Sequence, residues 1–147
     1  MVVPVRPGHS HKPVYYLIFV TRHMEGMATF AEQLSFAAEK WRRAVALPYA
    51  HDDTDYAYAE EIFRDEEQLL QEAWVGEIAT NISRLLAHGG PVPVLQNLPD
   101  VLGSGLGLTR DKHLRAAWRL AASRGLAAPP PKGKLIARGV QLLPPTA

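Results

Sequence analysis

The 147-residue sequence predicts a mainly α protein with a small β component, an α+β fold. Two long segments carry apolar side chains at three- and four-residue spacing, which is the period of an amphipathic helix. A short run of β-branched and aromatic residues near the start predicts a strand. The last third of the chain has helix, turn, helix and Pro/Gly-punctuated segments in the order of a winged helix. We therefore expect an N-terminal strand-helix association segment (1–50), an acidic connector and helix (51–75), and a winged-helix-like domain (76–147).

The predicted strand comprises residues Val14–Val20. All seven side chains are apolar or aromatic, and this absence of polar alternation predicts burial on both faces. A lone strand leaves backbone N–H and C=O groups unpaired. We therefore expect a partner protein or a homodimer to supply its neighbours. Apolar residues at helical spacing predict that the following segment, Glu25–Val45, is an amphipathic helix that shares in this association.

A second long helical region is predicted over Tyr58–His88. Gly76 lies within it, at a point where the region could divide into two helices. The sequence His88-Gly89-Gly90-Pro91 ends the region, because glycine terminates helices and proline cannot continue them. Before this region, the run His51–Asp55 predicts an acidic loop or linker.

The remainder of the chain predicts short elements around one basic helix. Val92–Val94 is a short strand candidate, and Leu95–Leu102 is a short helix candidate. Thr109 is a plausible N-cap for a helix that ends at Arg124. From Leu126 to Leu143 the pattern predicts a hairpin, with Lys132-Gly133 at its tip.

The net charge of +1 conceals an uneven distribution along the chain. Between His51 and Glu77, ten acidic residues stand against one basic residue. From Ile78 onward, nine basic residues stand against two acidic ones. Such asymmetry indicates a basic binding surface beside an acidic connector. The alternative is an acidic helix that packs near the basic helix and neutralises it within the fold.

Basic side chains share one face of the predicted Thr109–Arg124 helix, opposite its apolar face. Such cations neutralise phosphates and reach guanine edges, and basic residues of the hairpin could hold the flanking backbone. The candidate nucleic-acid-binding residues are Lys112, Arg115, Arg119, Ser123, Lys132, Lys134 and Arg138. The alternative is that exposed helices commonly carry Lys and Arg, and that this winged helix contacts protein.

Two further clusters contain residues that can bind ligands. Thr21-Arg22-His23 follows the predicted strand, where open α/β sheets gather ligand-binding groups, and its donors could hold a phosphate or a carboxylate. We favour the structural interpretation, in which this cluster caps the next helix or pairs with Glu25. The His51–Asp55 run offers three carboxylates and an imidazole, but it lacks the pattern of an EF-hand, so we expect a solvated linker and no metal.

The glycines at 103, 105 and 107 are weak evidence for a nucleotide site. They do not follow a predicted strand and lack the Lys-Ser/Thr of a phosphate loop. We expect a flexible connection between two helices.

A family resemblance supplements these patterns. The run Tyr15–Met27, an apolar strand followed by a Thr-Arg-His turn, a glycine and a helix, resembles the end of the methyltransferase-like domain in the three-Cys-motif partner proteins. The stretch that includes Leu85-Leu86, Gly89-Gly90 and His113–Ala117 resembles that family's C-terminal region. The resemblance implies a bacterial or phage accessory protein that works beside a separately encoded partner. The family's cofactor-binding portion has no counterpart here, so the resemblance carries over no catalytic residue.

Composition excludes several kinds of chemistry. The chain has no Cys, which excludes disulfides, thiolate zinc sites and cysteine nucleophiles. Its longest apolar run is too short to span a bilayer, and its start lacks a signal-peptide pattern, so we expect a cytoplasmic protein without a membrane segment. We expect no cofactor, and the sequence leans away from an enzyme.

The predicted function is a winged-helix accessory module that binds nucleic acid. The alternative is a non-catalytic protein-interaction subunit that docks onto a separately encoded partner. A weaker alternative is a small-anion site at Arg22 and His23.

Overall fold

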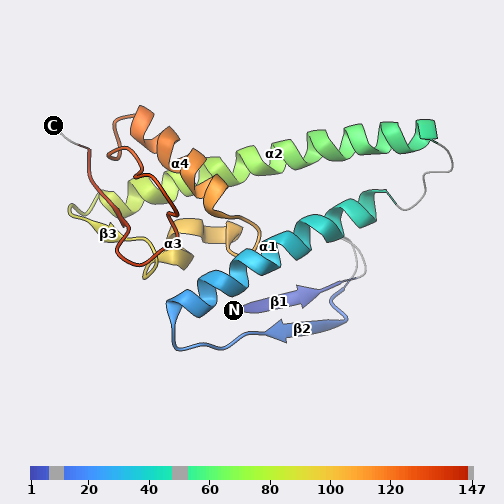
Figure 1. Ribbon diagram of the computed structural model, residues 1–147, viewed down its shortest axis with the longest axis horizontal. Coiled ribbons are helices and arrows are strands. Elements are labelled where there is room, and N and C mark those ends of the chain that lie inside the picture. Colours follow the sequence, from blue (N-terminus) through green and yellow to red (C-terminus); the bar gives the residue numbers. More distant parts are fainter. Residues whose placement is uncertain (7–11, 48–52, 146–147) are drawn as a thin grey trace.

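The computed structural model describes residues 1–6, 12–47 and 53–145. Over these residues the chain is mainly helical with two small antiparallel sheets, which confirms the predicted fold class (Figure 1). The helices are α1 (Met24–Ala46), α2 (Asp53–Leu86), α3 (Leu98–Leu102) and α4 (Asp111–Ser123), with a 3-10 turn, η1, at Gly103–Gly105. The strands are β1 (Val2–Val5), β2 (Tyr15–Ile18), β3 (Val92–Pro93) and β4 (Gln141–Leu142).

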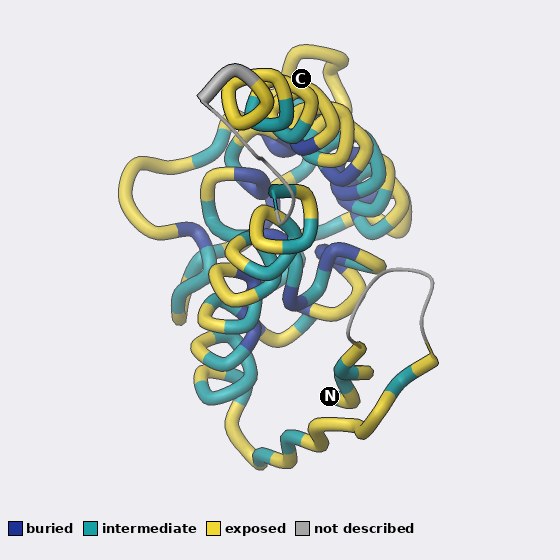
Figure 2. Tube along the Cα trace, turned by 90° about the vertical axis from the view of Figure 1, so that its right-hand side faces the viewer, coloured by how far each residue is buried: buried dark blue, intermediate teal, exposed yellow. Residues whose placement is uncertain are grey.

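The apolar core lies in the C-terminal half of the chain, where the last turns of α2 pack against α3 and α4. Figure 2 shows buried residues on the inward sides of the helices and none in the segments around the N-terminus. Trp118 is almost fully buried in the core, and its indole N–H donates to the Ala128 carbonyl at 2.8 Å. The principal core side chains are Ile78, Ile82, Leu86, Val94, Leu98, Val101, Leu102, Leu114, Ala117, Trp118, Ala121, Leu135 and Leu142.

Helix α2 belongs both to this core and to the acidic region before it. It runs from Asp53 to Leu86 as one element, so Gly76 does not divide it. The N-terminal half of α2 extends beyond the core, with α1 beside it (Figure 1). The predicted acidic linker at His51–Asp55 lies largely outside the described residues.

The start of α4 differs by one residue from the prediction. Arg110, not Thr109, is the N-cap. Thr109 is buried, and its hydroxyl donates to the Gly105 carbonyl at 2.8 Å. The Arg110 N–H instead donates to Nδ1 of His113 at 2.9 Å, which places His113 in the role that Glu or Gln plays in a capping box.

The predicted hairpin from Leu126 to Leu143 is wrong. Strand β4 pairs instead with β3, with Val92 opposite Leu142. The segment after α4 contributes the Ala128 N–H, which donates to the Leu143 carbonyl. Between Ala128 and β4 the chain forms an irregular loop, which we call the wing loop (129–140). The Asp111 carboxylate accepts the N–H groups of Leu135 and Ile136 at 2.6 and 3.0 Å, so this backbone satisfies its donors without a ladder.

The N-terminal strand pairs with a strand that the sequence analysis did not anticipate. Strands β1 and β2 form an antiparallel hairpin, with Val3 opposite Leu17. The predicted burial of Val14–Val20 on both faces is wrong for this chain, since Tyr15, Tyr16 and Ile18 are 59–67% exposed. The reason is that the hairpin lies outside α1, and only its inner side reaches that helix.

Candidate nucleic-acid interface

The outer face of α4 is the exposed basic surface that the sequence predicted. Lys112, Ala116, Arg119 and Ser123 are exposed and lie along one side of the helix, while Leu114 and the other core residues occupy the opposite side. The hydroxyl of Ser123 donates to the Leu120 carbonyl, within its own helix. Small Ala116 leaves room for close approach between the two cations.

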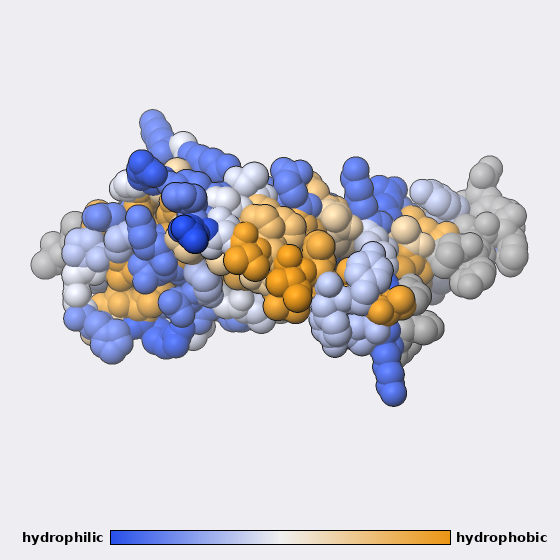
Figure 3. Space-filling view, turned by 90° about the horizontal axis from the view of Figure 1, so that it is seen from below, coloured by the Kyte–Doolittle hydropathy of each residue, from blue (hydrophilic) through white to orange (hydrophobic). Residues whose placement is uncertain are grey.

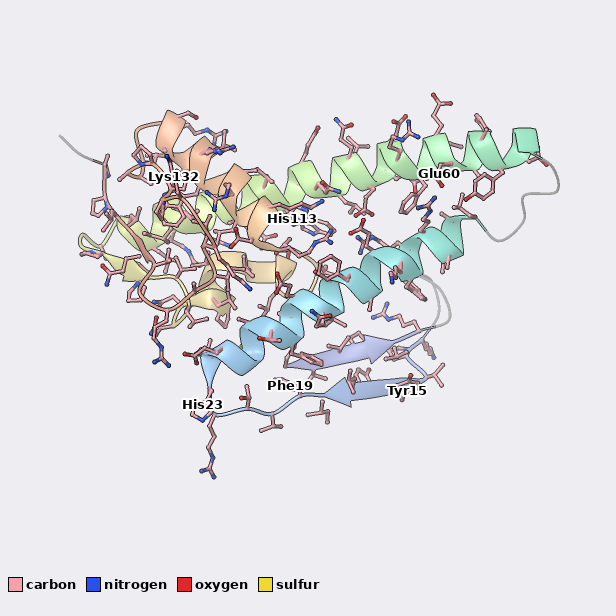
Figure 4. The ribbon with its side chains drawn as sticks, in the orientation of Figure 1. Tyr15, Phe19, His23, Glu60, His113 and Lys132 are labelled. Atoms are coloured by element: carbon pink, nitrogen blue, oxygen red, sulfur yellow. The ribbon has the colours of Figure 1, made fainter. Side chains whose placement is uncertain are left out.

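Arg115 contacts the wing loop rather than solvent. Its guanidinium donates to the carbonyl of Pro131 at 2.9 Å and also to the carbonyl of Gly133. These two contacts hold the intervening Lys132 next to α4, where the wing loop runs beside the helix (Figure 4). Arg115 also lies 3.6 Å from the Asp111 carboxylate. We therefore assign Arg115 a positioning role for the loop.

An acidic stripe on α1 neutralises the other basic residues of the wing loop. Its members are Glu25, Glu32 and Glu39, which are seven residues apart and so share one face of the helix. Glu25 pairs with Arg138 at 2.6 Å, and Glu32 pairs with Lys134 at 3.3 Å. Glu39 pairs with Arg110, the N-cap residue of α4.

Charge neutralisation leaves a smaller basic surface than the sequence predicted. Of the nine basic residues after Ile78, four are in ion pairs. Among the described residues, the five without an ion pair are Arg84, Lys112, Arg119, Arg124 and Lys132. The candidate interface therefore consists of Lys112, Arg119 and Lys132, with Arg124 at the end of the same helix.

The acidic part of α2 has its described ion pairs with α1. Arg42 donates to both carboxylate oxygens of Glu67, at 2.9 and 2.7 Å, and this guanidinium holds the pKa of Glu67 below its ordinary value. Arg43 pairs with Glu60 at 3.0 Å. The carboxylates that neutralise the wing loop thus come from α1. The charge distribution along the sequence had pointed instead to the acidic residues between His51 and Glu77.

His113 is a buried titratable group that the sequence analysis did not single out. It is 4% exposed, and its ring meets Trp74 edge-on at 5.9 Å between centroids. Burial, with help from nearby Lys112 and Arg110, lowers the pKa of His113 to about 4. Its Nε2 has no hydrogen-bond partner among the described residues. Because the sequence predicts the N-cap at Thr109, four residues before His113, it gives no signal for this capping role.

Thr21-Arg22-His23 forms the turn before α1. The Thr21 hydroxyl oxygen accepts the N–H of His23 at 3.1 Å, and Gly26 lies so close that an added Cβ would meet this oxygen at 2.9 Å. Arg22 and His23 are exposed. These contacts stabilise the turn itself, since the N-cap residue of α1, His23, makes no side-chain capping bond. Both the structural interpretation and the small-anion site stay predictions.

The glycine-rich segment before α4 is clamped by α2. The Glu77 carboxylate accepts both the N–H and the hydroxyl of Ser104, which lowers the pKa of Glu77. Gly103 adopts a φ of +57° directly against Glu77 and Asn81, where a side chain would collide. These contacts hold the turn at a defined place on α2.

Within residues 1–6, 12–47 and 53–145 there is no group of three His, Asp or Glu side chains that could hold a metal ion. No helix in those ranges combines the length and the apolar character needed to cross a bilayer.

Comparison of the chain with family models, with curated proteins and with solved structures finds no match. The resemblance to the three-Cys-motif partner proteins therefore stays a prediction.

Proposed function

We propose that the C-terminal part of this protein binds nucleic acid through the outer face of α4 and the wing loop. The main support for this proposal is that Arg115 fixes the wing loop next to α4. Lys132 of the loop, like Lys112 and Arg119 of the helix, is exposed. The order of the elements supports a winged-helix arrangement. After strand β3, helix α4 is the second helix, and the wing loop follows it.

The charge of this surface favours a phosphate backbone as the ligand. Lys112, Arg119 and Lys132 have no competing ion pair among the described residues, so each is available to an external anion. Lys and Arg supply phosphate contacts that do not depend on sequence. With three to four cations, we expect weak, salt-sensitive binding of duplex nucleic acid with little sequence preference.

Fluorescence anisotropy with duplex DNA and duplex RNA, over a series of salt concentrations, tests the proposal. We expect binding at low salt that the double variant Lys112→Glu/Arg119→Glu abolishes. The matched control is Lys40→Glu/Arg64→Glu, which makes the same change of charge at exposed positions on α1 and α2. Absence of binding at low salt, or equal loss in the control, contradicts the proposal.

A substitution of Arg115 separates positioning from direct contact. Arg115→Ala removes the contacts to Pro131 and Gly133 and should release the wing loop. We expect faster amide hydrogen exchange in residues 132–136, with weaker binding, while α4 keeps its exchange protection. If Arg115 instead contacts phosphate directly, binding should fall without any change of exchange in the loop.

The second candidate function, a protein-interaction subunit, is favoured by a different observation. Tyr16, Ile18 and Val20 are 60%, 67% and 84% exposed, and alternation places them on one side of the hairpin. Figure 3 shows apolar side chains gathered over this part of the surface. Exposed apolar patches of this kind mark docking sites.

Cross-link mapping in the native host tests this second function. Lys12, close to β2, should cross-link to a protein partner, and Ile18→Asp/Val20→Asp should abolish those cross-links. The variant Lys112→Glu/Arg119→Glu should keep them, because it lies on the other surface. Cross-links that survive the hairpin variant would contradict docking at this patch.

A further inference from the structure

The two sides of the hairpin face different surroundings. Phe19 stacks on Phe30 of α1, with ring centroids 4.1 Å apart and planes within 3°. Since side chains alternate along a strand, Tyr15 and Leu17 share the side of Phe19 that faces α1, and Tyr16 and Ile18 point away from it. On the inner side, β1 lines an apolar groove of about 640 Å³ together with α1 and α2.

The two edges of the hairpin differ in their capacity to add a strand. Met1 and Phe19 exchange both backbone hydrogen bonds at 2.9 Å, the Met1 donor being the terminal ammonium. Bonded and non-bonded pairs alternate in an antiparallel ladder, so Val3 and Leu17 form the next bonded pair. The N–H and C=O groups of Tyr16 and Ile18 therefore point away from β1, toward the free edge of β2.

The free edge of β1 is blocked by a proline. The same alternation directs Val2 and Pro4 toward that edge, and proline has no N–H to donate. The edge of β2 has no such protection, since Val14–Val20 contains neither proline nor a charge. Figure 1 shows β2 on the far side of β1 from α1, so no described element covers its edge.

We propose that the β2 edge pairs with β2 of a second copy of this chain, to form a four-stranded antiparallel sheet across a two-fold axis. The axis passes beside Leu17, so that Leu17 faces the same residue of the second copy. Tyr16 then lies opposite Ile18 of the second copy, and the two exchange both backbone hydrogen bonds, twice by symmetry. The inference concerns the hairpin alone and does not depend on the proposed nucleic-acid function.

Charge and sequence favour a second copy over a different strand. In this register Tyr15 lies opposite Phe19 and Tyr16 lies opposite Ile18, so each cross-strand pair beside the axis is aromatic or apolar. No like charges are brought together within the strand. The chain turns at Thr21, where the hydroxyl bonds the His23 backbone, and this turn takes Arg22 out of the sheet before it can meet Lys12 of the second copy.

The first test compares proline substitutions at the two edges. Sedimentation velocity of the wild type should give twice the chain mass of 16.2 kDa. Ile18→Pro removes one outward N–H without removing a bond of the β1–β2 ladder, and it should give the monomer mass. The matched control Val2→Pro makes the same change at the β1 edge and should stay dimeric. A monomeric wild type, or a dimer that persists in Ile18→Pro, overturns the proposal.

The second test reads the register and does not depend on how the fold tolerates proline. Because the chain has no Cys, a single cysteine reports one position. Leu17→Cys places two thiols across the axis in a non-bonded pair, at a spacing that suits a disulfide, and mild oxidation should give a cross-linked dimer. Tyr15→Cys, on the same side of the strand, should stay uncross-linked. Equal cross-linking of both variants, or none in Leu17→Cys, overturns the register.

Failure of this proposal is distinguishable from failure of the proposed functions. A monomeric protein that binds duplex nucleic acid with the expected salt dependence would contradict only the proposed dimer. A dimer with the predicted cross-link and no nucleic-acid binding would contradict only the proposed function of α4.

Discussion

The C-terminal body (76–145) and the N-terminal part (1–6, 12–47 and 53–75) are stabilised by different interactions. The C-terminal body buries apolar side chains from α2, α3 and α4 around Trp118. The N-terminal part buries few residues, Ala31, Ser35, Glu67 and Trp74, and leaves the aromatic strand β2 exposed. Five ion pairs connect α1 to α2, to the start of α4 and to the wing loop.

This difference explains how the protein can carry surfaces of two kinds. An apolar core of interdigitating side chains fixes the position of α4 and of its exposed basic face. Apart from the buried Arg42–Glu67 pair, these ion pairs are partly exposed and contribute little stability each, and no described element covers the outer side of the hairpin. The N-terminal part is therefore the region that gains most from association, through the covering of its patch or the pairing of its edge.

The largest expected effect comes from comparing the same substitution, Leu→Ala, in the two regions. Leu114→Ala, in the core of α4, should destabilise the protein by about 2–5 kcal/mol, because it leaves a cavity among fully buried side chains. Leu69→Ala, on α2 in the N-terminal part, removes a side chain that is 66% exposed and should cost below about 0.5 kcal/mol. Urea denaturation measures both. Similar losses would mean that the N-terminal part is covered in solution.

A somewhat smaller effect concerns the ion pair between α1 and α2. Arg42→Met leaves Glu67, which is 8% exposed, without its guanidinium partner. We expect a loss of about 2–4 kcal/mol at pH 7, since the remaining carboxylate is buried and charged. The double variant Arg42→Met/Glu67→Leu should recover most of this loss in urea denaturation. If the double variant is no more stable than the single one, the cost arises from lost packing rather than from the unpaired charge.

The pH dependence of stability tests the burial of His113. The folded state keeps this ring neutral down to a pKa of about 4, whereas the ordinary value is 6.5. The unfolded chain therefore binds a proton first as the pH falls, and stability should drop between pH 6.5 and pH 4, by at most about 3 kcal/mol. His113→Gln keeps an acceptor for the Arg110 N–H and removes the titration, so its profile should be flat from pH 6.5 to pH 5. If the stability of this variant still falls between pH 6.5 and pH 5, the loss arises from other titrating groups.

The smallest expected effect on stability concerns the acidic stripe of α1. Glu25 and Glu32 form partly exposed pairs with Arg138 and Lys134, so Glu25→Gln/Glu32→Gln should change the free energy of unfolding very little. The same variant frees two cations of the wing loop. Its affinity for duplex nucleic acid should rise, and the salt dependence of binding should steepen by about 2 in log–log slope. Unchanged affinity would place the wing loop outside the interface.

The sequence predicted the elements whose signal is local. Apolar periodicity over 25–45 and 58–88 anticipated α1 and most of α2, and Thr109–Arg124 anticipated α4 within two residues at each end. The exposed basic face of α4 also followed from periodicity. Successive side chains of a helix are 100° apart around its axis, so the positions of the apolar residues also determine which residues face solvent. Nothing in that periodicity indicates what lies beside the exposed face.

Tertiary contacts decided the features for which the sequence prediction was wrong. An all-apolar strand predicts burial, but Val14–Val20 lies in an exposed hairpin because no described element covers β2. The Pro/Gly pattern after α4 predicts a hairpin, but Asp111 and Arg115 hold the backbone of the wing loop through side chains, so it needs no ladder.

By itself, the sequence determined the mainly α fold class, the periods of α1, α2 and α4, and the excess of positive charge after Ile78. The tertiary structure alone decided which of those charges stay available. Glu25, Glu32 and Glu39 lie at least 71 residues before the cations that they neutralise, and ion pairs over that separation leave no periodic trace in the chain. The open edge of β2 is likewise a property of the fold, because strand pairing is set by which backbone groups meet in space.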